Sequence, residues 1–213
     1  KSQVVALNSG TAAIHLGLQL LGVQKGDVVL CQSLTFIASV NPVLYLGATP
    51  VFIGSEKETW NLCPIALEEA ILNQLHKGIQ PKAIVVVHLY GMPAKMNEII
   101  TISKKYNIPI LEDAAEALGS AYQGKPCGTL GDFGVFSFNG NKIITTSGGG
   151  ALICHSEIDK KKAVFLATQA KEDAVYYEHT QVGYNYRMSN ISASIGLGQL
   201  EVLSEHIQHR KQN

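Results

Sequence analysis

The chain has 213 residues, of which 46% are hydrophobic and 16% are charged, a composition that suits one packed core. Its 17 basic residues balance its 17 acidic residues, so it lacks the positive excess that nucleic-acid binding requires. The longest apolar run, Ala83 to Val87, is far shorter than the roughly 18 residues of a membrane-spanning helix. We therefore expect a soluble, cytoplasmic domain that binds neither nucleic acid nor membrane.

Strand-like runs alternate with helical patterns along the chain, which is typical of an α/β domain. Several strands are continuously apolar, as expected for a sheet covered by helices on both faces. The expected strands are Val4–Leu7, Val28–Cys31, Pro50–Ile53, Ala83–Leu89, Ile108–Glu112, Val135–Phe138 and Ala151–Cys154. The expected helices are Gly10–Leu21, Ile37–Leu46, Ile65–His76 and Ala94–Tyr106, and Ile195–Asn213 also has a helical pattern. The predicted fold is a mostly parallel sheet in the middle of three layers.

Residues that can carry chemistry follow several of these strands. In parallel α/β sheets, ligands bind beyond the carboxyl ends of the strands. These positions hold Ser9-Gly10-Thr11, Ser33 to Phe36, His88 to Gly91, Asp113 with Glu116, and Asn139 to Lys142. We expect the functional site at this edge of the sheet.

Lys142 follows an apolar strand and precedes the triple glycine Gly148 to Gly150. A lysine that faces a pocket at a strand end can act as an amine nucleophile toward carbonyl compounds. A surface lysine in a Gly/Asn turn is the simpler interpretation of this segment taken alone.

Asp113 lies at the carboxyl end of an apolar strand, beside the small residues Ala114 and Ala115. A buried carboxylate is costly unless a cation or several hydrogen bonds satisfy it, so it requires a partner such as a protonated ring nitrogen. The small neighbours leave room for a flat ring. The alternative is an N-cap for a short helix over Ala114 to Leu118.

Ser9-Gly10-Thr11 joins the first strand to a helix N-terminus, where free N–H groups and the helix dipole favour a phosphate. Simple capping by Ser9 is the alternative. The chain has neither a GxxxxGK[ST] loop nor a GxGxxG turn after a strand, so the usual nucleotide motifs are excluded.

Cysteine and histidine usage predicts neither a disulfide nor a metal site. The four cysteines form no CxxC pair, which is typical of reduced thiols in an intracellular chain. His206 and His209 have a helical spacing but no acidic or cysteine neighbours at ligand spacing, so a solvated helix face is expected there. Lys160 to Lys162 is interpreted in the same way.

Six motifs occur in the order and approximate spacing of one known family. They are Ser9-Gly10-Thr11, Thr35 to Ser39, Glu112 to Glu116, Gly131 to Lys142, Gly148 to Gly150, and Gly183 to Met188. The chain resembles the DegT/DnrJ/EryC1/StrS family of pyridoxal 5'-phosphate (PLP)-dependent sugar aminotransferases, which have the aspartate aminotransferase fold. Ser137 to Gly150 and Gly183 to Asn190 are most similar to enzymes that aminate a UDP-4-keto-6-deoxy-N-acetylhexosamine on the route to bacillosamine-type sugars.

The resemblance implies a role for each matching residue. Lys142 matches the lysine that binds the coenzyme covalently, Asp113 the carboxylate that pairs with the pyridinium nitrogen, and Phe36 the aromatic that stacks on the ring. Gly10, Thr11 and Ser137 match the phosphate-binding residues. Asn185 matches an asparagine that reaches the phosphate of the neighbouring subunit's coenzyme, which implies a homodimer with shared active sites.

Two positions refine this implied assignment. Glu116 stands where many family members have His or Gln, which leaves its role open between contacting the O3' side of the coenzyme and positioning the sugar. Lys142 stands where a dehydratase branch of the family has histidine, so the sequence favours amino transfer over dehydration.

Arg187 is the one arginine near a motif, since the chain contains only Arg187 and Arg210. A guanidinium grips a carboxylate well, so we assign Arg187 to the carboxylate of the amino donor. A phosphate of a nucleotide sugar is the competing ligand, and a structural ion pair is the plain alternative.

The ends of the sequence suggest a fragment of a longer polypeptide. The chain begins without Met, no signal-peptide apolar segment follows Lys1, and the helical pattern at the C-terminus lacks a partner. We expect residues 1–213 to be the PLP-binding large domain, without an N-terminal segment and without the family's small C-terminal domain.

The predicted function is transfer of an amino group from an amino acid, expected to be L-glutamate, to a nucleotide-linked 4-keto-6-deoxy sugar. Two alternatives stay open at this point. One is a PLP-dependent sugar dehydratase, and the other is a regulatory or binding protein on the same fold.

Overall fold

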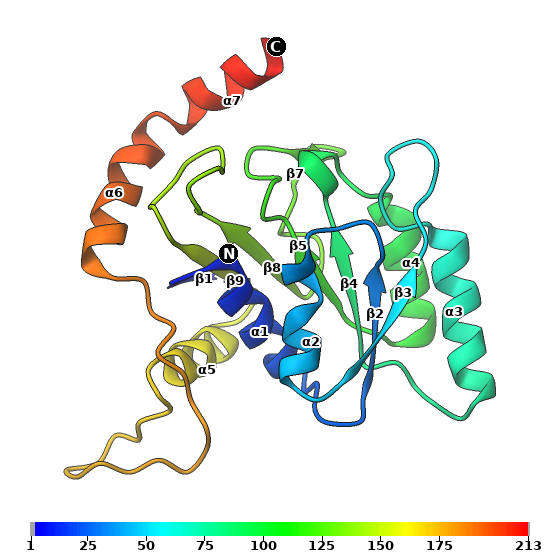
Figure 1. The fold of residues 1–213 in the computed structure, drawn as a ribbon, viewed down its shortest axis with the longest axis horizontal. Helices are drawn as coiled ribbons and strands as arrows, with labels where there is room; N and C mark the ends of the chain where they lie inside the picture. The colour runs from blue at the N-terminus through cyan, green and yellow to red at the C-terminus, as the bar shows by residue number, and fades with distance from the viewer. Residues whose placement is uncertain (1–2, 213) are drawn as a thin grey trace.

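A computed structural model describes residues 3–212, and its central element is a seven-stranded sheet with helices on both faces (Figure 1). Along the sheet the strand order is β1-β9-β8-β5-β4-β2-β3. Strand β9 is antiparallel to both neighbours, whereas the other adjacent pairs are parallel. The bounds are β1 Gln3–Leu7, β2 Val28–Gln32, β3 Thr49–Ile53, β4 Ala83–Val87, β5 Ile110–Asp113, β8 Phe133–Ser137 and β9 Gly150–Cys154. The expected three-layered, mostly parallel α/β fold is confirmed.

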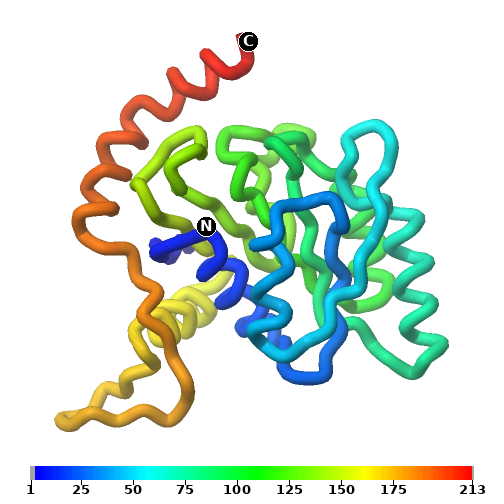
Figure 2. The backbone as a smooth tube through the Cα atoms, in the orientation of Figure 1, coloured from blue at the N-terminus to red at the C-terminus, as the bar shows by residue number. Residues whose placement is uncertain are grey.

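The helices divide between the two faces of the sheet. One face carries α1 (Gly10–Leu20), α2 (Asn41–Tyr45) and α5 (Glu157–Ala167), and the other carries α3 (Pro64–His76) and α4 (Met96–Tyr106). Helices α6 (Asn190–Glu201) and α7 (Leu203–Gln212) lie beside the sheet, after a long excursion of the backbone (Figure 2). Short elements complete the described chain: η1 Ile37–Ser39, η2 Leu89–Gly91 and the small hairpin of β6 (Ala121–Tyr122) and β7 (Lys125–Pro126). Within residues 3–212, no helix has the length and apolar character needed to span a bilayer.

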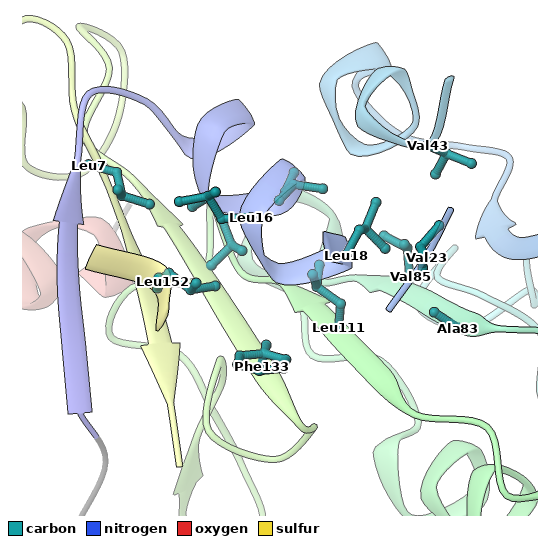
Figure 3. Close-up of a cluster of buried hydrophobic side chains, with 14 of the residues drawn as sticks. Leu7, Leu16, Leu18, Val23, Val43, Ala83, Val85, Leu111, Phe133 and Leu152 are labelled. Carbon is teal, nitrogen blue, oxygen red and sulfur yellow. The ribbon is translucent and has the colours of Figure 1, made fainter. Parts of the chain in front are cut away.

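The continuously apolar strands fill two cores at once, because side chains alternate between the faces of a strand. In β2, Val29 and Cys31 join the core under α1, while Val28 and Leu30 join the core under α3 and α4. Figure 3 shows Leu16 and Leu18 of α1 packed between strand residues that include Leu111 and Leu152. This double burial explains why period-two alternation is missing from the sequence of these strands.

The predicted elements differ from the structure mainly at their ends. Strand β5 begins and ends later than expected and so includes Asp113, and β8 begins at Phe133 instead of Val135. The strand expected to reach Leu89 stops at Val87, where the chain turns into η2. Strand and turn share apolar residues at these points, so periodicity alone could not locate the boundary.

Three helix predictions require correction. The helix expected over Ile37–Leu46 is two pieces, η1 and α2, because Pro42 occupies the first turn of α2 and favours a new start there. The expected helix over Ile195–Asn213 is replaced by α6, which begins earlier at Asn190, and α7; Asn213 itself lies outside the described residues. Helix α5 was not predicted, although Ser156 caps it by accepting the N–H of Asp159.

A buried pair, His88 and Glu112, joins the loop after β4 to the carboxyl end of β5. Both side chains are fully buried, and His88 Nε2 lies 2.8 Å from Glu112 Oε2. The ring proton lies on Nε2, because Nδ1 accepts the N–H of Ala94. Glu112 also accepts N–H groups from Gly128, Leu130 and Gly131.

Glu112 therefore stays ionised in the fold. Burial by itself would raise the pKa of this carboxyl, but the hydrogen bonds from His88, Gly131 and Gly128 outweigh burial and hold the pKa below its ordinary value. A lowered carboxyl pKa stabilises the fold above the unfolded pKa, about 4.3, and this stabilisation is lost as the pH falls through the folded value.

We expect Glu112→Gln to lower the free energy of unfolding at pH 7 by about 3 kcal/mol, because the amide N–H₂ group meets backbone donors that need an acceptor. The loss should shrink as the pH falls below about 4.3, because the unfolded carboxyl is protonated first and the stabilisation from the lowered folded pKa then disappears. Urea unfolding at several pH values measures both effects, with Glu69→Gln, at an exposed position, as the matched control. A loss equal at pH 3 and pH 7 would contradict the ionised state of Glu112.

Candidate functional site

A cavity of about 520 Å³ opens at the carboxyl ends of the parallel strands, the edge where the sequence predicts the site. It is lined by residues that follow β1, β2, β4, β5 and β8 and by the loop before β9. Of the predicted site residues, those that line it are Gly10, Thr11, Phe36, Asp113, Glu116, Ser137 and Lys142. Asn185 and Arg187 are not among its lining residues.

Asp113 is the buried charge of this cavity. It ends β5 and is 5% exposed, with Oδ2 accepting the hydroxyl of Ser39 at 2.6 Å and Oδ1 accepting the N–H of Ala115 at 3.1 Å. Residues Ala114 to Leu118 form turns, so the alternative in which Asp113 caps a helix there is wrong. Burial raises the pKa of Asp113, and the hydrogen bonds from Ser39 and Ala115 and the charge of Lys142 offset part of the rise.

The N-terminus of α1 forms a second part of the cavity wall. Ser9 is the N-cap and accepts the N–H of Ala12 at 3.1 Å, so the capping interpretation of Ser9 is correct. Capping leaves other N–H groups of the first helical turn without an intrahelical partner, and such groups favour an anion. Gly10 and Thr11 supply this turn.

Two close approaches explain the glycines around α1. A Cβ on Gly10 would lie 3.0 Å from Cβ of Ser137, and a Cβ on Gly150 would lie 2.4 Å from the carbonyl carbon of Ser9. The helix N-terminus therefore rests directly on the ends of β8 and β9. This packing places Ser137 beside the first turn of α1.

Lys142 lies against Glu116 at the far side of the cavity. The side chain of Lys142 is 16% exposed, and its Nζ lies 3.2 Å from Oε1 of Glu116. The other carboxylate oxygen of Glu116 accepts the N–H of Tyr90 at 3.1 Å. Lys142 is thus held at a pocket, which argues against the plain surface-lysine interpretation, and Glu116 has a contact that the sequence did not predict.

Phe36 lies at the mouth of the cavity. Its side chain is 76% exposed and precedes η1, whose last residue, Ser39, contacts Asp113. An aromatic ring with an open face at this position is available for stacking on a planar ligand.

Asn185 and Arg187 lie outside their own chain's cavity, and both are exposed. Their backbone pairs with Thr168 and Leu7 in isolated bridges. None of the ion pairs found within residues 3–212 includes Arg187, so the structural ion pair considered for it is not observed there.

Sequence analysis missed some of the residues that shape the site. Ser39 lies in the motif Thr35 to Ser39 but was assigned no role. Nothing in its local pattern indicated a contact with Asp113, which is 74 positions away. The pairing of Glu112 with His88 was also missed, although charged and polar residues within or directly after apolar strands were a usable signal. His206 was expected on a solvated face, yet its Nδ1 donates to the carbonyl of Ile143 at 2.9 Å.

The whole chain matches one family model. Residues 1–213 match the DegT/DnrJ/EryC1/StrS aminotransferase family, and the chain belongs to this family. The resemblance inferred from the six motifs is confirmed.

Several curated relatives align with nearly all of the chain. The Bacillus subtilis protein EpsN, named as a candidate pyridoxal phosphate-dependent aminotransferase, is 56% identical over 206 residues, which cover 97% of this chain and 53% of EpsN. GDP-perosamine synthase of Escherichia coli O157:H7 is 43% identical, with 97% and 55% covered. A UDP-4-amino-4,6-dideoxy-N-acetyl-beta-L-altrosamine transaminase of Campylobacter jejuni is 37% identical, with 97% and 54% covered. The chain thus spans about half the length of the curated relatives it matches.

A solved structure agrees with the same assignment. The candidate sugar aminotransferase Spr1654 of Streptococcus pneumoniae, in its PLP form, superposes with a TM-score of 0.88 at 31% identity, covering 98% of this chain and 57% of that protein. The same protein has also been solved in a PMP form. The expected coenzyme, pyridoxal phosphate, is confirmed for the family.

The cavity fits that coenzyme on its own chemistry. A carboxylate has about four acceptor sites, and Asp113 has two donors within the described chain, so it can still accept from a cationic ring nitrogen. The first turn of α1 with Ser137 suits the phosphate, and Lys142 supplies an amine at the pocket. Within residues 3–212, no cluster of three or more His, Cys, Asp or Glu side chains is arranged to hold a metal ion.

We expect Ser39→Ala to raise the pKa of the Asp113 carboxyl further, because the Ser39 hydroxyl donates to this carboxylate and stabilises its charged form, and such a hydrogen bond is worth about 1.5 to 3 kcal/mol. Carbon-13 NMR of the Asp113 carboxyl in the coenzyme-free protein measures the shift.

Thr35→Val is the matched control. It removes the contact of Thr35 with Ser39, 2.8 Å between the two hydroxyl oxygens, and leaves the Ser39–Asp113 hydrogen bond in place. An Asp113 pKa that is unchanged or lowered in Ser39→Ala would show that Ser39 does not tune this carboxyl.

Proposed function

We propose that this chain is the PLP-binding part of an aminotransferase that moves an amino group from an amino acid, L-glutamate, to a nucleotide-linked 4-keto-6-deoxy sugar. Residues 1–213 then correspond to the large domain of a longer, cytoplasmic enzyme. The observation that carries the proposal is the convergence of Asp113, Lys142 and the N-terminus of α1 on one cavity. When bound, the coenzyme supplies an electron sink for the amino acid's α-carbon.

Each residue of the cavity has a task in this proposal. Asp113 keeps the ring nitrogen protonated, and its burial strengthens that interaction because the surrounding dielectric is low. The first turn of α1 and Ser137 bind the phosphate, and Phe36 stacks on the ring. These residues would hold the coenzyme in the cavity that Lys142 also lines.

Lys142 holds the coenzyme and then moves a proton at its Nζ. General acid–base catalysis of this kind contributes roughly 10² to 10⁴ in rate. Glu116, 3.2 Å from Nζ, would orient the Lys142 amine for that proton transfer. This orienting role adds a third possibility to the two that the sequence left open for Glu116.

The sugar substrate is proposed by similarity. The Campylobacter relative is named for a UDP-linked N-acetylated sugar, which supports UDP-4-keto-6-deoxy-N-acetylhexosamine, the substrate expected from the sequence. The Escherichia relative, at higher identity, is named for a GDP-linked sugar, so a GDP-4-keto-6-deoxyhexose is the second candidate.

Incubation of the full-length protein with L-glutamate and each ketosugar, followed by mass analysis of the product, tests the proposal. We expect one of the two nucleotide sugars to gain an amino group in place of the ketone. Loss of water without gain of nitrogen would support the dehydratase alternative. A protein that stays colourless after coenzyme addition would support a non-catalytic binding protein.

We expect Asp113→Asn to leave the coenzyme bound and to reduce turnover by about tenfold to a thousandfold, because a carboxylate beside a cation favours the charged form by about 1 to 3 pK units. The rate constant at saturating substrate measures the effect. Asp173→Asn, at an exposed position, is the matched control. An unaltered rate constant in Asp113→Asn would remove Asp113 from the mechanism.

The active unit in this proposal is a homodimer with shared sites. The exposure of Asn185 and Arg187 outside their own cavity supports a role in the neighbouring subunit's site, at the coenzyme phosphate and the donor carboxylate or a sugar phosphate. A two-fold dimer would exchange the same segment in both directions.

Mixing two inactive variants tests the shared site. In a heterodimer of Lys142→Ala with Asn185→Ala/Arg187→Ala, one site combines an intact Lys142 with an intact neighbouring segment. We expect this heterodimer to recover at most half of the wild-type turnover per dimer. An isolated heterodimer without recovered activity would assign Asn185 and Arg187 to their own subunit's site or to no site.

A further inference from the structure

The segment that carries Asn185 and Arg187 is held like an additional strand between β1 and the end of α5. Tyr186 accepts the backbone N–H of Asn8 at 2.7 Å on one side, and its own N–H donates to Ala167 at 3.0 Å on the other. Isolated bridges join Arg187 to Leu7 and Asn185 to Thr168. The backbone of this segment is therefore fixed relative to the start of the sheet.

Alternation along the segment separates its side chains. Tyr184 and Tyr186 pack against the buried core, where their rings stack at 4.8 Å and the Tyr186 hydroxyl lies 3.1 Å from Nδ1 of His15. Asn185 and Arg187 are exposed. The inward tyrosines thus present the two polar residues to the outside together.

Asn8 is the residue that joins this segment to the cavity. Its side-chain Nδ2 donates to the carbonyl of Asn185 at 3.1 Å, in addition to the backbone bond to Tyr186. Asn8 also lines the cavity and directly precedes Ser9, the cap of α1. The Asn8 side chain therefore contacts the segment that carries Asn185 and Arg187, and it lies next to the first turn of α1 in its own chain.

We propose that Asn8 is a positioning residue for the neighbouring subunit's active site: its side-chain amide fixes the carbonyl of Asn185 and so directs Asn185 and Arg187 into the partner's site. The inference rests on the shared site of the proposed function. Asn8 acts across the dimer, although it lines the cavity of its own chain. The competing role is support of Ser9 within its own site, through the 3.4 Å contact of Ser9 Oγ with Asn8 Oδ1.

Two heterodimers of the full-length protein separate these roles, with Lys142→Ala used to silence one site. The visible absorbance of lysine-bound coenzyme then reports on the remaining site alone. In the first heterodimer, a wild-type chain pairs with Asn8→Ala/Lys142→Ala, so the reporting site receives its outward segment from the Asn8→Ala chain. In the second, Asn8→Ala pairs with Lys142→Ala, so the reporting site lies in the Asn8→Ala chain and receives an intact segment.

We expect the Kd for pyridoxal phosphate to rise about tenfold in the first heterodimer, as for the loss of a hydrogen bond to a site that binds a charged group. In the second heterodimer the Kd should match that of wild type paired with Lys142→Ala. Weakening confined to the second heterodimer, equal weakening of both, or no weakening would each overturn the proposal. Turnover of the same heterodimers should follow the same pattern.

Two further variants make the result decisive. Asn8→Asp keeps the size and removes the Nδ2 donor, so it replaces Asn8→Ala if that variant does not fold. Asn97→Ala is the matched control. It removes an asparagine Nδ2 that donates to Gln123, and neither residue lines the cavity, so the Kd for pyridoxal phosphate should stay unchanged in both heterodimers.

Asn185→Ala in the same two arrangements distinguishes this inference from the proposed function. If Asn185→Ala does not weaken the first heterodimer, the shared site itself is wrong. If Asn185→Ala weakens it and the Asn8 variants do not, only the role of Asn8 is wrong.

Discussion

The carboxylate of Glu112 is fully buried and accepts hydrogen bonds from His88 and from three backbone N–H groups of the loop before β8. These hydrogen bonds fix the carboxyl end of β5, the middle strand of the sheet, to the loop before β8. Glu112 and Asp113 are consecutive strand residues, so they face opposite sides of the sheet. The anchoring of one side chain therefore sets the direction in which its neighbour enters the cavity.

The surroundings of Asp113 itself do not favour a charged carboxylate. Burial raises the pKa of Asp113, and its donors within the described chain are the Ser39 hydroxyl and the Ala115 N–H. In the proposed function, a cationic ring nitrogen of the coenzyme would be the further partner of this buried carboxylate. Binding of the coenzyme and relief of this buried charge are thus the same event in the proposed mechanism.

The layers of the fold could be predicted because buried parallel strands are continuously apolar in sequence. All but two of the proposed site residues line one cavity, because ligands in such sheets bind beyond the carboxyl ends of the strands. Side-chain contacts between distant segments could not be predicted from such local patterns. The bonds of Ser39 to Asp113 and of Asn8 to Asn185 join residues 74 and 177 positions apart. Helix α5 was missed because its lysines obscured an apolar face formed by Ala163, Leu166 and Ala167.

Reduction of the coenzyme-loaded protein with borohydride tests the assignment of Lys142 as the residue that holds the coenzyme. The reduced protein carries the coenzyme on whichever lysine held it, and digestion with mass analysis of the peptides identifies that residue. We predict the label on the peptide that contains Lys142 and on no other lysine peptide. A label on a different lysine, or a loaded protein that gives no labelled peptide, would contradict it.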